Sequence, residues 1–111
     1  MIEQLTQRYV EAFAAKDLNT IASMMSDDFE LTDPSVHVRG KKEALEVVRS
    51  IFDGNPRKFL FRATNIYVDR QTSIMEFVFE IEGATLKGAD VIEWKGGSMT
   101  AVRAYVYQAS S

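Results

Sequence analysis

The chain has 111 residues, enough for one domain with a hydrophobic core and too few for two. Its formal net charge is −3 and no run of like charge appears, so we expect no nucleic-acid partner. The absence of cysteine excludes disulfides, thiolate nucleophiles and cysteine-ligated zinc. No window approaches the roughly 20 apolar residues of a membrane span, and the acidic, amphipathic N-terminal stretch does not resemble a secretory signal. We therefore expect a single cytoplasmic domain over residues 1–111, with no membrane partner. We also expect no metal and no cofactor.

Three amphipathic helices are predicted in the first half of the chain. Residues 2–15 place apolar side chains, and the ring of Tyr9, on one helix face. The segment "KDLNTIASMMSDDF" predicts a short second helix with Met24 and Met25 inward, and "KKEALEVVRSIF" predicts the third. Between them, residues 29–33 predict a short strand that stops at Asp33-Pro34, because proline has no N–H for a strand ladder. A loop is expected to follow it.

From Arg57 onward the hydrophobic period changes to two. The segments "KFLFRATNIYVD", "SIMEFVFEIE", "LKGADVIEW" and "MTAVRAYVY" predict four strands with short connections, which favour an antiparallel meander. In the second of them Met75, Phe77 and Phe79 share one face, while glutamates occupy the other. The sheet should therefore have one apolar side facing the helices and one wetter side, an α+β arrangement.

Asp90 is the anomaly of the inner face. A turn at residues 83–84 would place Phe77 opposite Asp90 and Phe79 opposite Gly88. The inner face would then carry these residues of the last two strands: Leu86, Gly88, Asp90, Ile92, Trp94, Thr100, Val102, Ala104 and Val106. A carboxylate in such an apolar row should be protonated, paired or facing a wet cavity, because burying it charged and alone is costly.

Several of these segments resemble ketosteroid isomerase and the SnoaL-like polyketide cyclases of the NTF2-like superfamily. The resemblance covers the whole chain and rests on "RYVEAFAAKDLNTIASMMSDDFELTDP", on Gly40 before the third helix, and on "DVIEW…GSMTAVRAY". Tyr9 and Asp33 have the spacing of the oxyanion tyrosine and the base aspartate of bacterial ketosteroid isomerases. Asp90 takes the place of their second, protonated aspartic acid. The resemblance implies an NTF2-like (cystatin-like) cone, with three N-terminal helices packed on a strongly curved, mainly antiparallel sheet that encloses a hydrophobic pocket.

The resemblance also implies a cofactor-free isomerase or cyclase that abstracts a proton next to a carbonyl. Asp33 would be the base, and Tyr9 and a neutral Asp90 would donate hydrogen bonds to the developing enolate oxygen. The ligand would be a small hydrophobic molecule. The residues expected to contact it are Phe13, Met24, His37, Val47, Val48, Phe52, Met75, Phe77, Phe79, Ile92, Trp94, Val102 and Ala104.

Two features depart from the isomerase pattern. Val48 stands where the family has a tyrosine that orients the oxyanion tyrosine, and the hairpins around Asp90 are shorter. An alternative alignment puts Glu93 at the inner acid position. Asp90 is preferred, because Glu93 falls on the outer face in the register above.

Each candidate residue also has a purely structural interpretation. Tyr9 would be a core tyrosine, Asp33 a turn residue, Asp90 a buried hydrogen-bonding group and His37 an exposed loop residue. The corresponding alternative function is a non-catalytic small-molecule-binding or dimerisation module of the same superfamily.

Two further expectations concern the strands. Arg103 and Tyr105, on the outer face of the last strand, favour a homodimer formed through that face of the sheet. Epoxide hydrolysis, another activity of this fold, is disfavoured because it needs an Asp–Arg–Asp arrangement in the pocket. No inward Asp-x-Arg or Arg-x-Asp pair occurs on these strands.

Overall fold

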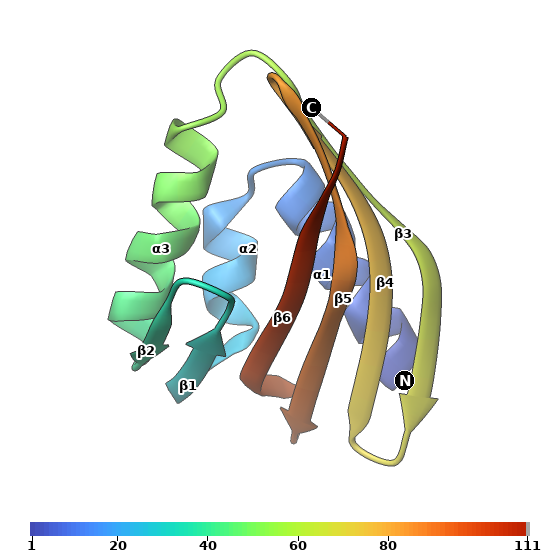
Figure 1. Cartoon of the computed structure of the whole chain (residues 1–111). Coiled ribbons are helices and arrows are strands. Elements are labelled where there is room, and N and C mark those ends of the chain that lie inside the picture. The colour runs from blue at the N-terminus through green and yellow to red at the C-terminus, as the bar shows by residue number, and fades with distance from the viewer. Residues whose placement is uncertain (111) are drawn as a thin grey trace.

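Three helices pack on one face of a single curved sheet (Figure 1). The computed structural model describes residues 1–110. Its elements are α1 (Ile2–Ala14), α2 (Leu18–Ser23), β1 (Met25–Thr32), β2 (His37–Arg39), α3 (Lys41–Asp53), β3 (Phe59–Asp69), β4 (Thr72–Ile81), β5 (Ala84–Lys95) and β6 (Ser98–Ser110). The strand order is β2-β1-β6-β5-β4-β3, and only β1 and β6 pair in parallel. The predicted α+β architecture, with helices on one side of a mainly antiparallel sheet, is confirmed.

The helices form where apolar residues recur at helical spacing. α1 buries Thr6, Tyr9, Ala12 and Phe13 along one face, and α3 buries every fourth residue from Ala44, namely Ala44, Val48 and Phe52. α2 begins at Asp17, whose carboxylate accepts a hydrogen bond from the Thr20 backbone N–H at 3.1 Å. In the part of the chain that the structure describes, no helix is long and apolar enough to cross a membrane.

The prediction for residues 24–40 was wrong in two respects. α2 ends at Ser23, and the strand expected over 29–33 begins at Met25. Met25 pairs in parallel with Met99 of β6, and a register shift then lets β1 continue to Thr32 beside Arg103. In addition, the expected loop contains the short strand β2, which pairs with β1 from Glu30 to Thr32. Both features depend on partners distant in sequence, which local periodicity does not report.

The register predicted between β4 and β5 was wrong by two residues. Ile81 pairs with Ala84, so a tight turn at 82–83 closes the hairpin, with Gly83 at φ +83°. Asp90 therefore lies opposite Met75, and Phe77 lies opposite Gly88. Because a shift of two preserves the side to which each residue points, the inward orientation of Asp90 is confirmed. Its predicted partner on β6, Ala104, is also confirmed.

At the start of β6 a bulge changes which residue is buried. Trp94 pairs with Met99 and Glu93 with Ala101, which leaves Thr100 as the extra residue. Met99 is fully buried, whereas Thr100 is only partly buried and donates its hydroxyl to the Glu93 carbonyl. The expectation that Thr100 lies on the inner face next to Trp94 was wrong, and Met99 takes that place.

Two irregularities bend the long strands around the helices. In β3, Thr64 is inserted between Ala63 and Asn65, which pair with consecutive residues of β4. In β5, Gly88 lies so close to β6 that a Cβ there would come within 2.0 Å of the Tyr105 carbonyl oxygen. Any side chain at position 88 would push these strands apart. The resulting curvature leaves space between the sheet and α3.

Candidate functional site

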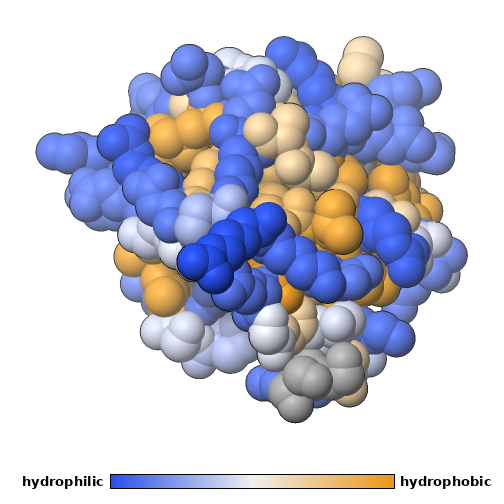
Figure 2. Space-filling view, turned by 90° about the horizontal axis from the view of Figure 1, so that it is seen from above, coloured by the Kyte–Doolittle hydropathy of each residue, from blue (hydrophilic) through white to orange (hydrophobic). Residues whose placement is uncertain are grey.

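A cavity of about 410 Å³ lies between the inner face of the sheet, α1, α3 and the β1–β2 turn. Viewed from above the orientation of Figure 1, apolar residues are gathered near the centre of the molecule, with hydrophilic residues around them (Figure 2). The volume lies in the lower part of the range of small-molecule sites, about 300–1,000 Å³. Tyr9, Asp33 and Asp90, the three residues proposed for chemistry, all line this cavity.

Asp90 lies on β5 among apolar neighbours. Met75 of β4 and Ala104 of β6 are its cross-strand partners, and the residue is only 7% exposed. Burial, and secondarily the negative charge of Asp33, raise the pKa of Asp90 to about 7. At neutral pH the group is therefore partly a neutral carboxylic acid, which can donate a hydrogen bond.

Tyr9 projects from α1 and is also 7% exposed. Burial, and then the charge of Asp90, raise its pKa above the ordinary value, so the phenol keeps its proton. Within residues 1–110, every fully enclosed side-chain nitrogen or oxygen has a hydrogen-bond partner. No hydrogen bond contributes to the pKa shift of Tyr9 or Asp90, and both side chains line the cavity, so their polar atoms reach its open space.

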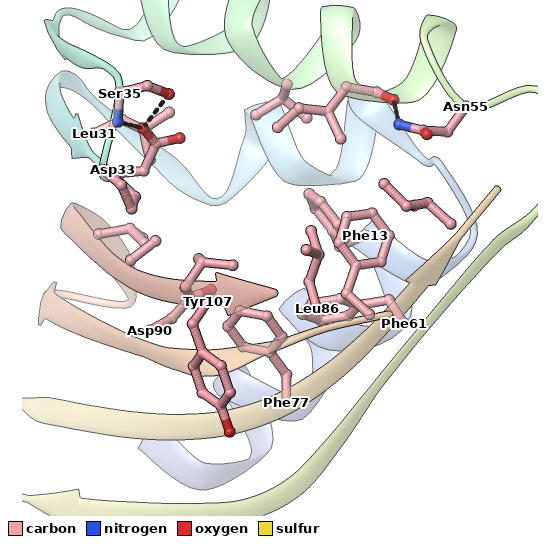
Figure 3. A pocket seen from close by; sticks show the side chains of 18 of the residues that line it. Phe13, Leu31, Asp33, Ser35, Asn55, Phe61, Phe77, Leu86, Asp90 and Tyr107 are labelled. Carbon is pink, nitrogen blue, oxygen red and sulfur yellow. Dashed lines mark hydrogen bonds between the residues drawn. The ribbon is translucent and has the colours of Figure 1, made fainter. Parts of the chain in front are cut away.

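Asp33 lies at the end of β1, on the side of the cavity opposite Asp90 (Figure 3). Its Oδ1 accepts hydrogen bonds from the backbone N–H of Ser35 at 2.8 Å and of Val36 at 2.7 Å, and from the Ser35 hydroxyl at 3.3 Å. This is the turn chemistry typical of aspartate before proline. Oδ2 accepts no hydrogen bond from the described residues, so the same side chain fixes the turn with one oxygen and offers the other.

The cavity wall is mainly apolar. Of the residues expected to contact a ligand, six line it: Phe13, Val48, Phe77, Phe79, Val102 and Ala104. Eleven others were not included in that expectation: Leu31, Pro34, Ser35, Ile51, Asn55, Phe61, Ile81, Leu86, Val106, Tyr107 and Gln108. The alternation of β3 could have added Phe61, which pairs with Phe79. Leu86 and Val106 had been placed on the inner face of the sheet from the sequence, but they were not named as ligand contacts.

The remaining expected ligand contacts lie elsewhere in the core. Met24, Phe52, Met75, Ile92 and Trp94 are buried in side-chain packing and do not line the cavity, nor does the partly buried Val47. Phe52, for example, packs its ring against Phe13 and Phe59 at centroid distances of 5.3 and 5.5 Å. These residues support the cavity wall from behind.

Two polar candidates lie on the surface. His37 is on β2, with its Nε2 2.6 Å from Oε2 of Glu30, and it does not line the cavity. Glu93 points to the outer face, where it accepts hydrogen bonds from Thr72 at 2.6 Å and Arg103 at 2.7 Å. Those bonds lower its pKa, Thr72 having the larger effect. Asp90, and not Glu93, therefore occupies the inner acid position.

A second buried polar group lies deeper in the core. The Trp94 indole donates to Ser73 Oγ at 3.0 Å, the hydroxyls of Ser73 and Thr6 lie 2.8 Å apart, and Thr6 donates to the Ile2 carbonyl at 2.8 Å. We call these three residues the Trp94 network, and Tyr9, Asp33 and Asp90 the Asp90 cluster. Only the Asp90 cluster opens onto the cavity.

The chain shares its fold with solved structures described as NTF2-like or as having a cystatin-like fold. A candidate ketosteroid isomerase from Kribbella flavida DSM 17836 matches with a TM-score of 0.86 at 15% identity, over 99% of this chain and 80% of that one. A protein of ketosteroid isomerase-like fold from Catenulispora acidiphila DSM 44928, in complex with trimethylamine, matches with a TM-score of 0.79 at 17% identity. The match covers 96% of this chain and 87% of that one. An LEH-like epoxide hydrolase from M. tuberculosis matches with a TM-score of 0.76 at 18% identity, over 94% of this chain and 80% of that one.

The sequence identifies the family within this fold. The model of the SnoaL-like domain matches residues 6–102, and the chain belongs to that family. No curated protein matches the chain. The family and the curved-sheet fold agree with the resemblance noted from the sequence, and the site chemistry must be argued from the residues themselves.

Proposed function

We propose that this protein catalyses proton abstraction next to a carbonyl, as an isomerase or cyclase acting on a small hydrophobic ligand without a cofactor. The observation that carries the proposal is the Asp90 cluster: three polar groups from separate elements around one apolar cavity, with the pKa values of Asp90 and Tyr9 both raised. A ligand in this cavity would meet a carboxylate from the β1–β2 turn and two proton-bearing groups from α1 and β5.

The division of labour follows from these environments. Asp33, at the partly exposed turn, is the group that takes the proton from carbon through its free Oδ2. Its turn hydrogen bonds fix Oδ1 and so hold the side chain in place. Tyr9 and neutral Asp90 donate hydrogen bonds to the carbonyl oxygen as negative charge develops on it, and such donors act most strongly where water is excluded. Returning the proton to a different carbon completes an isomerisation.

The apolar wall limits the ligand class. Around the three polar groups the cavity is lined by phenylalanine and aliphatic side chains, which suits a flat hydrophobic molecule with one carbonyl. No arginine is among the described lining residues, so the Asp–Arg–Asp arrangement expected for epoxide hydrolysis is not present there. The likeness to an epoxide hydrolase thus concerns the fold alone.

The test is turnover of a small panel of β,γ-unsaturated ketones, followed by the ultraviolet absorption of the conjugated product. Asp33→Asn keeps an acceptor oxygen for the turn and removes the base, so kcat/KM should fall by about 10²–10⁴-fold. The matched control is Asp27→Asn, which changes an exposed carboxylate on β1, the strand that precedes Asp33, and should leave kcat/KM unchanged. Unchanged turnover in Asp33→Asn contradicts the proposal.

The pH profile gives a second test of the same mechanism. Because Asp90 must carry a proton and its pKa is about 7, kcat/KM should decline as the pH rises through about 7. In Asp90→Asn the amide donates at every pH, so this decline should disappear. Tight ligand binding that survives Asp33→Ala, without turnover of any ketone, would instead favour the non-catalytic binding module.

We also propose a homodimer formed through the outer face of the sheet. Tyr105, 60% exposed, lies on that face with the exposed Tyr67 and Ile74, an apolar set unusual for a free surface. Sedimentation velocity should give a dimer at micromolar concentration and a monomer for Tyr105→Asp. A monomer at every concentration of the unaltered protein contradicts this.

A further inference from the structure

The ionisable groups that line the cavity are all acids. They are Tyr9, Asp33, Asp90 and Tyr107, and no lysine, arginine or histidine is found among the described lining residues. Asp90 is more than nine-tenths buried, and only burial and the charge of Asp33, with no hydrogen bond, shift its pKa. When it ionises, the protein supplies no counter-ion for it inside the cavity, and a neighbouring carboxylate, Asp33, adds to the negative potential. An anionic ligand would be repelled by this site, and a cation would be attracted.

Phenylalanine rings form the wall next to these acids. The ring centroid of Phe61 lies 4.7 Å from that of Phe13, 5.1 Å from Phe77 and 5.6 Å from Phe79. Phe77 follows Met75, the cross-strand partner of Asp90, on the inner face of β4. The face of an aromatic ring carries partial negative charge and attracts organic cations. The wall therefore suits the apolar body of a ligand as well as its positive charge.

We propose that this cavity binds lipophilic ammonium ions, with ionised Asp90 as the counter-ion and the phenylalanine rings around the apolar part of the ligand. The binding does not depend on the catalytic activity proposed above. It follows from a buried, unpartnered carboxyl that opens into an aromatic cavity without a basic residue among its described lining.

The charge on Asp90 then determines which ligand the cavity accepts. The titratable groups that face it are Tyr9 from α1 and Asp33 from the β1–β2 turn, while β4, β6 and α3 present Met75, Ala104 and Val48. Burial and the Asp33 charge set the pKa of Asp90 at about 7. Below that pH the neutral acid donates to a carbonyl oxygen, and above it the carboxylate attracts a cation. Neutral carbonyl compounds and organic cations should therefore show opposite pH dependences.

Isothermal titration calorimetry with two isosteric probes tests this. Benzyltrimethylammonium carries a permanent charge, and neopentylbenzene has the same shape without it, so only the protein titrates. Between pH 6 and pH 8 the ionised fraction of a group with pKa 7 rises from about one tenth to about nine tenths, so the Kd of the cation should fall about tenfold. The Kd of neopentylbenzene should change less than about twofold.

Two variants locate the effect. Asp90→Asn should bind the cation about tenfold more weakly at pH 8 and lose the pH dependence, since the charge is gone and the shape is kept. Asp69→Asn removes an exposed carboxylate at the end of β3 and should behave as the unaltered protein. Circular dichroism confirms folding, and if Asp90→Asn fails to fold, the pH profile of the unaltered protein decides.

Three results would overturn the inference: no binding of the cation, binding that does not change between pH 6 and pH 8, or unchanged affinity in Asp90→Asn. These outcomes are separate from the ketone assay. Loss of turnover in Asp33→Asn without cation binding would leave the proposed activity standing and reject the ammonium site. Cation binding with unchanged turnover in Asp33→Asn would leave the ammonium site standing and reject the proposed activity.

Discussion

The two buried polar clusters differ in one respect, the number of hydrogen bonds that the protein itself supplies. They share two elements: α1 contributes Thr6 to one and Tyr9 to the other, and β5 contributes Trp94 and Asp90. In the Trp94 network each polar group meets another, at 2.8–3.0 Å. In the Asp90 cluster no hydrogen bond from the described chain contributes to the pKa shift of Tyr9 or of Asp90.

This difference separates a structural role from a ligand-binding one. A buried polar group without a partner costs free energy, and folded proteins rarely retain one. The Trp94 network meets this requirement internally and fixes the packing of α1 on the sheet. The Asp90 cluster leaves its donors and acceptors directed at a cavity, where a ligand could bind them. The predictions below test whether the two clusters respond to mutation as this comparison requires.

The largest effect is expected from the charge on Asp90. Its pKa in the folded protein is about 7, against about 4 when unfolded, so the folded state holds its proton more tightly. The stability linked to this proton is fully present below pH 4 and is lost as the pH rises through 7, a difference of about 4 kcal/mol. Asp90→Asn should abolish this component and be more stable than the unaltered protein at pH 8.

Urea unfolding followed by Trp94 fluorescence, from pH 4 to pH 8, measures this. The quantity to compare is the difference between the unaltered protein and Asp90→Asn. Carboxyls with a lowered pKa, such as Glu93, make the folded state less stable as the pH falls, and this contribution is the same in both proteins. Parallel pH profiles for the two proteins would mean that Asp90 titrates normally, and the distinction between the clusters would fail.

A smaller change in the free energy of unfolding is expected from a substitution in the Trp94 network. Ser73→Ala removes the acceptor of the Trp94 indole, which has no other partner in the described part of the chain. The buried N–H would be left unsatisfied, at a cost of about 1–3 kcal/mol in the free energy of unfolding. Turnover per folded molecule should not change, because Ser73 does not line the cavity. A loss of turnover larger than the loss of folded protein would show that the network also positions the site.

The inner face of the sheet could be predicted from the sequence because side-chain direction depends only on alternation. The turn between β4 and β5 was placed incorrectly, yet the two-residue error left Asp90 inward and Glu93 outward. The start of β1 and the strand β2 could not be predicted in this way. They exist because Met25 and His37 find partners on β6 and β1, and no local pattern encodes those pairings.

To predict which residues line the cavity, one must know where along each strand the open space lies, as well as the side to which each side chain points. Ile92 and Asp90 point to the same side of β5, but only Asp90 lines the cavity. How far along a strand the open space extends depends on where α1 and α3 cross the sheet, and residue types do not specify that. Asp33 illustrates another limit. Its turn role and its place at the cavity were treated as alternatives, and the structure combines them in the two oxygens of one carboxylate.

The smallest effects should come from deleting one hydroxyl of each cluster on the same helix. Thr6→Val removes a hydroxyl with two partners and should cost about 1 kcal/mol. Tyr9→Phe removes a hydroxyl with none and should change the free energy of unfolding by less than about 0.5 kcal/mol, while lowering turnover of the ketone panel. Both residues are buried three positions apart on α1, so each variant is the control for the other. If Tyr9→Phe proved the more destabilising, its hydroxyl would have a structural partner, and the contrast between a satisfied network and a site awaiting its ligand would not hold.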